Sequence, residues 1–201
     1  MNSFSFLLVL LALAITSSVA DKVPDFVIPG KCPYVDEYRL WEQQKPNLAK
    51  FGGVWFQYAL TNNPYQLLTQ CVRLQYDFNG KGFDASAVGL TQDGSLLKRF
   101  GDISPMPLGD PHLMVNFENS FAAPLVVLDT DYSNYACLYS CMEYNFGYYS
   151  DFAFIFTRNP KQGDAYASKC ETAFKSIGLD TSRFYKTAQG AQCPYETQQG
   201  H

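Results

Sequence analysis

The chain has 201 residues, of which 47% are hydrophobic, 16% aromatic and 17% charged. This balance excludes an intrinsically disordered chain, which needs few apolar residues and a high net charge. The net charge is -4, and an acidic chain is not expected to bind nucleic acid, because phosphate contacts need clustered Lys and Arg. The length predicts one domain with a sizeable core.

The N-terminal residues have the pattern of a secretory signal peptide. Residues 4–15 form an apolar run that is too short to span a bilayer. Ser18-Val19-Ala20 then supplies the small-x-small pattern of a cleavage site before Asp21. No Lys or Arg precedes the run, which departs from the usual signal, and a membrane anchor is the alternative. We expect removal of residues 1–20 and a secreted, extracellular chain, residues 21–201, that forms a single domain without a membrane span.

All six cysteines lie in the expected mature chain. An even number in a secreted protein favours three disulfides, for which fifteen pairings exist. The alternative is a zinc site, but the chain has only two histidines, His112 and His201, and no Cys-x-x-Cys pair. We therefore expect no metal. The cysteines are Cys32, Cys71, Cys137, Cys141, Cys170 and Cys193.

Short segments rich in strand-forming residues, separated by turn signals, run through most of the chain. In one of them Leu74, Tyr76 and Phe78 alternate with polar residues, and the hairpin signal Asn79-Gly80 follows. The candidate strands are residues 55–61, 73–78, 83–90, 96–100, 112–117, 125–128, 135–141 and 152–158.

A single segment, Gln162 to Ile177, has helical spacing of its apolar residues and ends at Gly178. Eight strands without intervening helices, followed by one helix, predict an all-β fold. The expected architecture is an eight-stranded antiparallel up-and-down β-barrel with one C-terminal α-helix packed outside. Such a barrel has room for one small ligand, although a barrel filled by side chains is the alternative.

Three short motifs lie in a recognisable order on these elements. Gly53-Val54-Trp55 opens the first strand, Thr130-Asp131-Tyr132 lies between two late strands, and Arg158 closes the last strand. Together they resemble the three signature regions of the lipocalins. In that fold Gly53, Trp55 and Arg158 close the barrel. We expect Trp55 to plug one end and Arg158 to lie across its ring as a cation–π contact.

Longer segments, including 59–66, 121–124 and 131–141, resemble the crustacyanins, the astaxanthin-carrying lipocalins of crustacean shell. The resemblance covers essentially the whole expected mature chain. Related insect lipocalins join the N-terminal segment to a late strand and the second strand to the tail. Carried over, this implies the disulfides Cys32–Cys141 and Cys71–Cys193, and leaves Cys137–Cys170 to pin the helix to the barrel.

The resemblance implies a secreted carrier of a hydrophobic pigment, above all the carotenoid astaxanthin, bound non-covalently and contributing to shell or tissue coloration. One end ring of the carotenoid would enter the barrel, and polar groups or waters would reach its keto oxygen. The colour shift arises in the ligand itself. The protein contributes the orientation of the ligand and the electrostatic environment around it. The alternative is another small apolar ligand in the same fold: a bilin, a retinoid, a sterol or a fatty acid.

Three polar residues are candidates for contact with the ligand oxygen. Gln57 is expected on the same inward strand face as Trp55. Tyr76 is expected on the inward face of the next strand, together with Leu74. His112 begins a strand after a Pro-rich loop, where an inward side chain would lie in the barrel. The alternative for all three is a position in the wall, where the side chain satisfies local hydrogen bonds.

Leu74, Met114 and Phe117 are expected to line the same region. Crustacyanins can carry polar side chains at these positions, so the apolar residues put the strength of the colour shift in doubt.

No catalytic residue is expected. A Ser-His-acid arrangement needs a histidine, for which only His112 is available, and Asp129 and Asp131 belong to a structural turn. The protein is therefore not expected to be an enzyme.

The resemblance implies a hetero-oligomer with a second crustacyanin-type subunit. The aromatic segment 144–149 is a candidate exposed patch for this contact, and a loop folded over the barrel mouth is the alternative.

Overall fold

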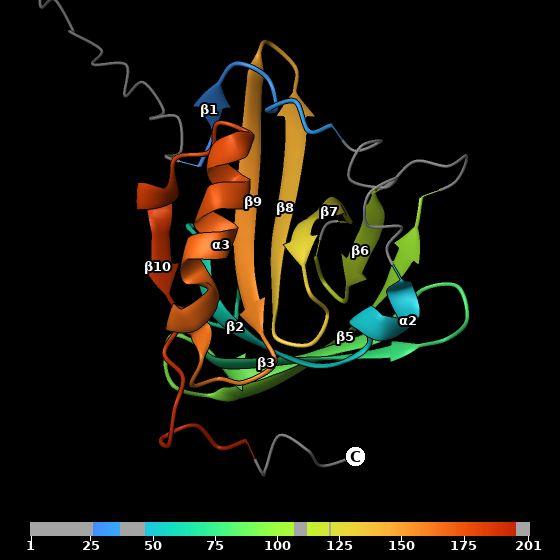
Figure 1. Cartoon of the computed structure of the whole chain (residues 1–201), viewed down its shortest axis with the longest axis vertical. Helices are drawn as coiled ribbons and strands as arrows, with labels where there is room; N and C mark the ends of the chain where they lie inside the picture. The colour runs from blue at the N-terminus through green and yellow to red at the C-terminus, as the bar shows by residue number, and fades with distance from the viewer. Residues whose placement is uncertain (1–25, 37–46, 107–111, 121, 196–201) are drawn as a thin grey trace, which may run out of the picture.

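The computed structural model describes residues 26–36, 47–106, 112–120 and 122–195 (Figure 1). The expected signal peptide, residues 1–20, lies outside them. The elements in chain order are β1 (Ile28–Pro29), α2 (Leu48–Phe51), β2 (Gly53–Thr61), β3 (Gln70–Phe78), β4 (Phe83–Leu90), β5 (Leu96–Pro105), β6 (Leu113–Phe117), β7 (Ala123–Thr130), β8 (Tyr135–Tyr144), β9 (Tyr148–Thr157), α3 (Gly163–Ser176), the 3-10 turn η2 (Thr181–Arg183) and β10 (Phe184–Lys186).

Strands β2 to β9 form a closed antiparallel barrel, as the sequence predicts. Each strand pairs with the next one along the chain, and β9 also pairs with β2, which closes the ring. The short strands β1 and β10 extend the sheet at β9 and β2. Every predicted strand is present. The strand predicted at residues 96–100 continues to Pro105, because Gly101 and Asp102 pair with β6 although they are poor strand formers.

Alternation along the strands separates two apolar clusters. On β9, Phe154 and Phe156 belong to the cluster inside the barrel, whereas Ala153 and Ile155 belong to a second cluster outside it. Helix α3 covers this outer cluster with Cys170 and other apolar side chains. Figure 1 shows α3 lying along the face of β9. The helix therefore packs outside the barrel, as the sequence predicts, and leaves the interior free.

The start of α3 fits closely onto β2. A Cβ atom at Gly163, the first residue of the helix, would overlap the ring of Tyr58. The Tyr58 hydroxyl donates a hydrogen bond of 2.7 Å to Asp164, and Lys186 on β10 forms an ion pair with the same carboxylate. Because only glycine leaves space for the tyrosine ring, Gly163 sets how closely the helix approaches the barrel.

Trp55 and Arg158 close one end of the barrel. Trp55 is completely buried, and its indole donates a hydrogen bond of 2.8 Å to the Phe51 carbonyl in α2. Gly53, with φ of +92°, begins β2 beside them, and a Cβ atom there would lie 3.3 Å from Nη1 of Arg158. The positive φ favours glycine, so the Gly-x-Trp motif has a conformational reason as well as a packing one.

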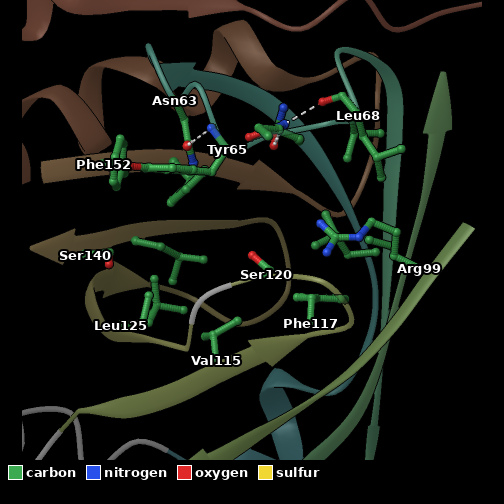
Figure 2. Close-up of a pocket in the computed structure, with 18 of the residues that line it drawn as sticks. Asn63, Tyr65, Leu68, Arg99, Val115, Phe117, Ser120, Leu125, Ser140 and Phe152 are labelled. Atoms are coloured by element: carbon green, nitrogen blue, oxygen red, sulfur yellow. Dashed lines mark hydrogen bonds between the residues drawn. The ribbon is translucent and has the colours of Figure 1, made fainter. Parts of the chain in front are cut away.

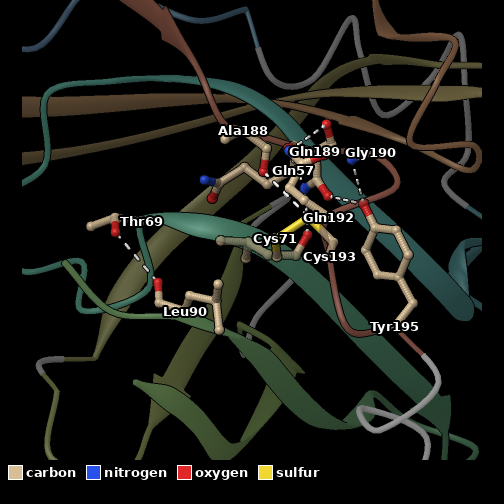
Figure 3. Close-up of a disulfide and its surroundings, with 11 residues drawn as sticks. Gln57, Thr69, Cys71, Leu90, Ala188, Gln189, Gly190, Gln192, Cys193 and Tyr195 are labelled. Atoms are coloured by element: carbon tan, nitrogen blue, oxygen red, sulfur yellow. Dashed lines mark hydrogen bonds between the residues drawn. A yellow bond between two sulfur atoms is a disulfide. The ribbon is translucent and has the colours of Figure 1, made fainter. Parts of the chain in front are cut away.

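Three disulfides hold the segments outside the barrel in place. They are Cys32–Cys141, Cys71–Cys193 and Cys137–Cys170, the pairing that the family resemblance implies. Figure 3 shows Cys71–Cys193, where the C-terminal segment lies along β3. Next to it, the Gln189 amide donates hydrogen bonds of 2.9 Å to the carbonyls of Gln57 and Val72. The tail is therefore fixed by hydrogen bonds as well as by the disulfide.

Candidate ligand-binding cavity

The barrel interior is not filled by its side chains. A cavity of about 210 Å³ lies between its walls, and most of the side chains that line it are apolar. Alternate residues of β9, namely Phe152, Phe154 and Phe156, supply one wall, and Leu74 and Tyr76 of β3 supply another. An apolar cavity with few polar groups is typical of a small-molecule site, and its presence rules out the filled barrel.

The connection between β2 and β3 lies over the cavity at the end opposite Trp55. Asn63 and Tyr65 from this connection line the cavity, and Figure 2 shows both above its centre. The Tyr65 ring contacts Phe152 edge-on at a centroid distance of 6.3 Å, and Phe26 contacts Tyr65 from the other side at 5.6 Å. The rings of Tyr65 and Phe152 therefore form part of the cavity mouth, and Phe26 packs against Tyr65 without lining the cavity itself.

Gln57 lines the cavity and is buried, as its shared face with Trp55 predicts. Both ends of its amide are already engaged. Its nitrogen donates to the Thr187 hydroxyl at 2.8 Å, and its oxygen accepts from the Gln66 amide at 2.9 Å. These bonds tie the mouth connection and the C-terminal segment to β2. In this structure Gln57 satisfies local hydrogen bonds, the alternative that the sequence left open.

Tyr76, Leu74 and Phe117 also line the cavity. Tyr76 is buried, with its ring stacked against Phe51 at a centroid distance of 6.0 Å. Burial raises the pKa of its hydroxyl above the ordinary value. As a residue of the cavity wall, Tyr76 remains a candidate to donate its hydroxyl to an oxygen atom of a ligand.

The sequence analysis missed several polar residues of the cavity, among them Ser140 and Arg99. Ser140 on β8 lines the cavity and is buried, and its Oγ makes no hydrogen bond. Arg99 on β5 lines it too (Figure 2). Strand parity could have found Ser140, because Ala136 and Leu138 precede it on the same inward face. Arg99 could not be named from the sequence, because the parity of its strand was not known.

The Lipocalin / cytosolic fatty-acid binding protein family matches residues 52–191 of the chain. The chain belongs to this family. The matched segment begins directly before β2 and contains the whole barrel and α3. The segment that matches the family therefore includes the barrel closed by Trp55, the outer helix and the interior cavity of this lipocalin.

Within the lipocalins, the chain is similar to crustacyanin subunits, as its motifs indicate. It is 61% identical over 178 residues to the crustacyanin-C1 subunit of Homarus gammarus and 60% identical over 178 residues to the crustacyanin-A1 subunit of that species. Each alignment covers 89% of this chain and 98% of the relative. A crystal structure of apocrustacyanin C1 superposes with a TM-score of 0.84 at 60% identity, covering 88% of this chain and 98% of that one.

His112 and Met114, two of the expected ligand contacts, are not brought to the cavity of this lipocalin. Leu113, Val115 and Phe117 of β6 belong to the interior cluster, so Met114 has the opposite parity and faces away from it. His112 directly precedes β6, in the connection from β5, and is not part of the cavity wall. The predicted ligand contacts at these two positions therefore have no support from the cavity geometry.

Over the part of the chain that the structure describes, no group of three or more His, Cys, Asp or Glu residues is placed to hold a metal ion. Within the same residues, no helix combines the length and apolar character needed to cross a membrane.

Proposed function

We propose that the protein is a secreted carrier of a hydrophobic pigment, and that its ligand is astaxanthin. The observation that carries this proposal is the apolar cavity inside the barrel of a chain that is 61% identical to a crustacyanin subunit. The protein acts here as a binding protein and not as an enzyme. Its contribution is to hold the chromophore and to surround it with fixed dipoles.

The residues of the cavity fit the polar end of a carotenoid. An end ring of astaxanthin is apolar apart from its keto and hydroxyl oxygens. The wall offers aromatic rings together with the hydroxyl groups of Tyr76 and Ser140, of which Ser140 Oγ has no hydrogen-bond partner. A cavity of about 210 Å³ suits an end ring and not a whole carotenoid. The remaining polyene would leave through the mouth beside Tyr65.

The proposed route to the extracellular space uses the N-terminal segment. Cleavage between Ala20 and Asp21 would leave residues 21–201 as one secreted domain. Three disulfides and no free cysteine among the described residues suit an oxidising compartment. Mass determination of the protein recovered from a secreting cell tests the cleavage point directly.

A second crustacyanin-type subunit is the proposed partner. The relatives in Homarus gammarus are themselves named subunits. In the aromatic segment 144–149, Phe146 is 96% exposed at the β8–β9 turn and Tyr144 is 40% exposed. Tyr148 and Tyr149 instead pair with β1. An exposed aromatic tip supports the interaction patch and not a loop folded over the mouth.

The patch is tested by measuring assembly and pigment binding in one variant. Replacing Phe146 with Ser should weaken assembly with the partner subunit in size-exclusion chromatography, while the isolated chain retains the same amount of astaxanthin. Loss of pigment without loss of assembly would contradict the assignment.

The pigment proposal is tested by the absorbance spectrum of the oxidised mature protein with astaxanthin, alone and with a partner subunit. We expect co-elution of pigment and protein and a shift to longer wavelength. The shift should be smaller in Tyr76→Phe, which removes only the hydroxyl, and unchanged in the exposed control Tyr34→Phe. The shift is also measured in His112→Ala. It should be smaller there if His112, which remains a predicted contact, lies close to the ligand oxygen. Absence of pigment from both samples would overturn the proposal.

A further inference from the structure

The barrel wall has a seam between β2 and β3. Direct pairing of the two strands runs from Gly53, opposite Tyr76, to Phe56, opposite Arg73. The seam lies beyond this stretch, between residues 57–61 of β2 and 70–72 of β3, on the side of the cavity mouth. Because buried backbone N–H and C=O groups are almost always hydrogen-bonded, the facing edges of the two strands need another partner there.

The C-terminal segment fills this seam. The Thr187 amide donates a hydrogen bond of 2.9 Å to the Tyr58 carbonyl of β2. On the other side, the Ala188 carbonyl accepts one of 2.8 Å from the Cys71 amide of β3. Strand β10, which directly precedes Thr187, also pairs with β2. The segment therefore takes the place of a strand between β2 and β3.

The Gln189 amide spans the seam from one side to the other. It donates to the carbonyls of Gln57 on β2 and Val72 on β3, each at 2.9 Å, and both of these residues line the cavity. Figure 3 shows Gln189 beside the Cys71–Cys193 disulfide, which holds the segment to β3. At this point two parts of the cavity wall are joined through the tail and not by a direct strand pair.

The same segment reaches the cavity mouth through the side chain of Gln57. The Thr187 hydroxyl accepts from the Gln57 amide, whose oxygen accepts in turn from the amide of Gln66 in the β2–β3 connection. Gln66 lines the cavity and also donates to the Leu68 carbonyl at 2.7 Å. Thr187 and Gln57 are both buried, and a buried polar group is costly to leave without a partner. The position of the tail is therefore coupled to that of the mouth connection.

We infer that the C-terminal segment, residues 187–193, controls the rate at which a ligand enters and leaves the cavity. It closes the seam, and through Gln57 it holds the mouth connection in place. Thr187, Gln57 and Gln189 are positioning residues, which act on the ligand through the wall. The inference rests on the proposed function only for its test ligand, because the same wall surrounds any molecule in the cavity.

The test measures the mouth and the ligand separately. The amides of Gln66 and Thr69 are hydrogen-bonded to the carbonyls of Asn63 and Leu90, so their hydrogen exchange, followed by NMR, reports opening of the β2–β3 connection without any ligand. Ligand release is measured as transfer of bound astaxanthin to phosphatidylcholine vesicles. If the protein holds no astaxanthin, the pigment proposal fails, and the amide exchange still decides the role of the tail.

Thr187→Val keeps the size of the side chain and removes the acceptor of the Gln57 amide. We expect it to speed both the exchange of the two mouth amides and the release of astaxanthin about tenfold, as for one unsatisfied buried group. Thr187→Ser keeps the hydroxyl and should restore the slow rates. The amide of Glu118 in the β6–β7 turn, bonded to the Phe100 carbonyl at 2.9 Å, should exchange at the same rate in all three proteins.

A matched pair of glutamines separates closure of the seam from general loosening of the tail. Gln189→Ala removes the amide that joins β2 to β3 and should speed both processes about tenfold. Gln192 is exposed on the same segment, and its amide donates to the Gln189 carbonyl at 3.3 Å, so Gln192→Ala should leave both rates unchanged. Unaltered rates in Thr187→Val and Gln189→Ala, or equal effects of the two glutamine variants, would overturn the inference.

Discussion

The guanidinium carbon of Arg158 lies 3.6 Å from the centroid of the Trp55 ring. In that position its nitrogens donate hydrogen bonds to three separate segments of backbone. Nε reaches the carbonyl of Tyr132 at 3.0 Å, Nη1 reaches that of Val54 at 2.7 Å, and Nη2 reaches that of Lys50 at 3.1 Å. One side chain at the end of β9 therefore holds α2, the start of β2 and the β7–β8 turn together.

Removing this guanidinium should destabilise the closed end of the barrel. Arg158→Met keeps the apolar stem but leaves several carbonyls without their charged donor, so we expect a loss of about 3 kcal/mol in the free energy of unfolding. Urea denaturation followed by tryptophan fluorescence measures it. Lys161→Met, which removes an exposed cation nearby, is the control and should change stability by less than about 0.5 kcal/mol. Similar losses in the two variants would refute the role of Arg158.

Gly163 offers a test of how α3 is seated on the barrel. An alanine there would press its Cβ atom into the Tyr58 ring, and we expect Gly163→Ala to cost about 2 kcal/mol as an overpacked contact. The same substitution in a Tyr58→Ala background should cost little, since the obstructing ring is gone. Thermal unfolding of the four proteins of this cycle gives the coupling. Additive effects would show that the helix does not rest on Tyr58.

The ion pair between the buried Asp151 and the partly exposed Arg183 fixes the segment after α3 to β9. Arg183 Nη2 lies 2.7 Å from Oδ1 of Asp151, whose side chain is nearly inaccessible to solvent. Arg183→Met leaves that carboxylate buried without its partner, and we expect a loss of about 3 kcal/mol or more in the free energy of unfolding. The double variant Asp151→Asn/Arg183→Met should lose less than Arg183→Met alone. A larger loss in the double variant would contradict this explanation.

Alkaline pH should destabilise the protein through its buried tyrosines. Burial raises the pKa of Tyr76 above the ordinary value, and burial together with the charge of Asp151 raises that of Tyr139. Below a pH of about 10 both folded and unfolded chains keep these protons, and stability is full. Above it the unfolded chain loses them first, so the free energy of unfolding falls by about 1.4 kcal/mol per pH unit for each tyrosine.

Urea denaturation between pH 8 and pH 11 measures this dependence. The slope should be shallower in Tyr76→Phe and in Tyr139→Phe than in the unaltered protein. Tyr34→Phe, at an 82% exposed position, is the matched control. Identical slopes in all four proteins would exclude these two tyrosines as the cause.

The barrel was predictable because period-two alternation and turn signals are local in sequence. Phe152, Phe154 and Phe156 show their shared face without any knowledge of the strands beside them. The short strands β1 and β10 could not be found in this way, because two or three residues carry no measurable period. Their place in the sheet depends on pairing with Tyr149 and Leu60, which are distant in sequence.

The cavity was harder to predict, because a strand's parity has to be fixed before its inward residues can be named. Met114 and Phe117 cannot face the same way on a regular strand, yet both were expected to line the cavity. The structure fixes the parity of β6 with Val115 and Phe117 inside. Arg99 needed the register with Ala87, which only the folded sheet supplies.

Each of the three disulfides joins a barrel strand to a segment that is not a barrel strand. Cys141 and Cys137 of β8 hold the N-terminal segment and α3, and Cys71 of β3 holds the C-terminal tail. None of them links two of the eight strands, so ring closure depends on the backbone hydrogen bonds between β2 and β9. Reduction would therefore remove one of the restraints on the chain ends and on α3, and would leave the hydrogen bonds that close the barrel in place. In the reduced protein, we expect proteases to cleave the terminal segments and α3 first. The barrel strands that surround the ligand would be cleaved last.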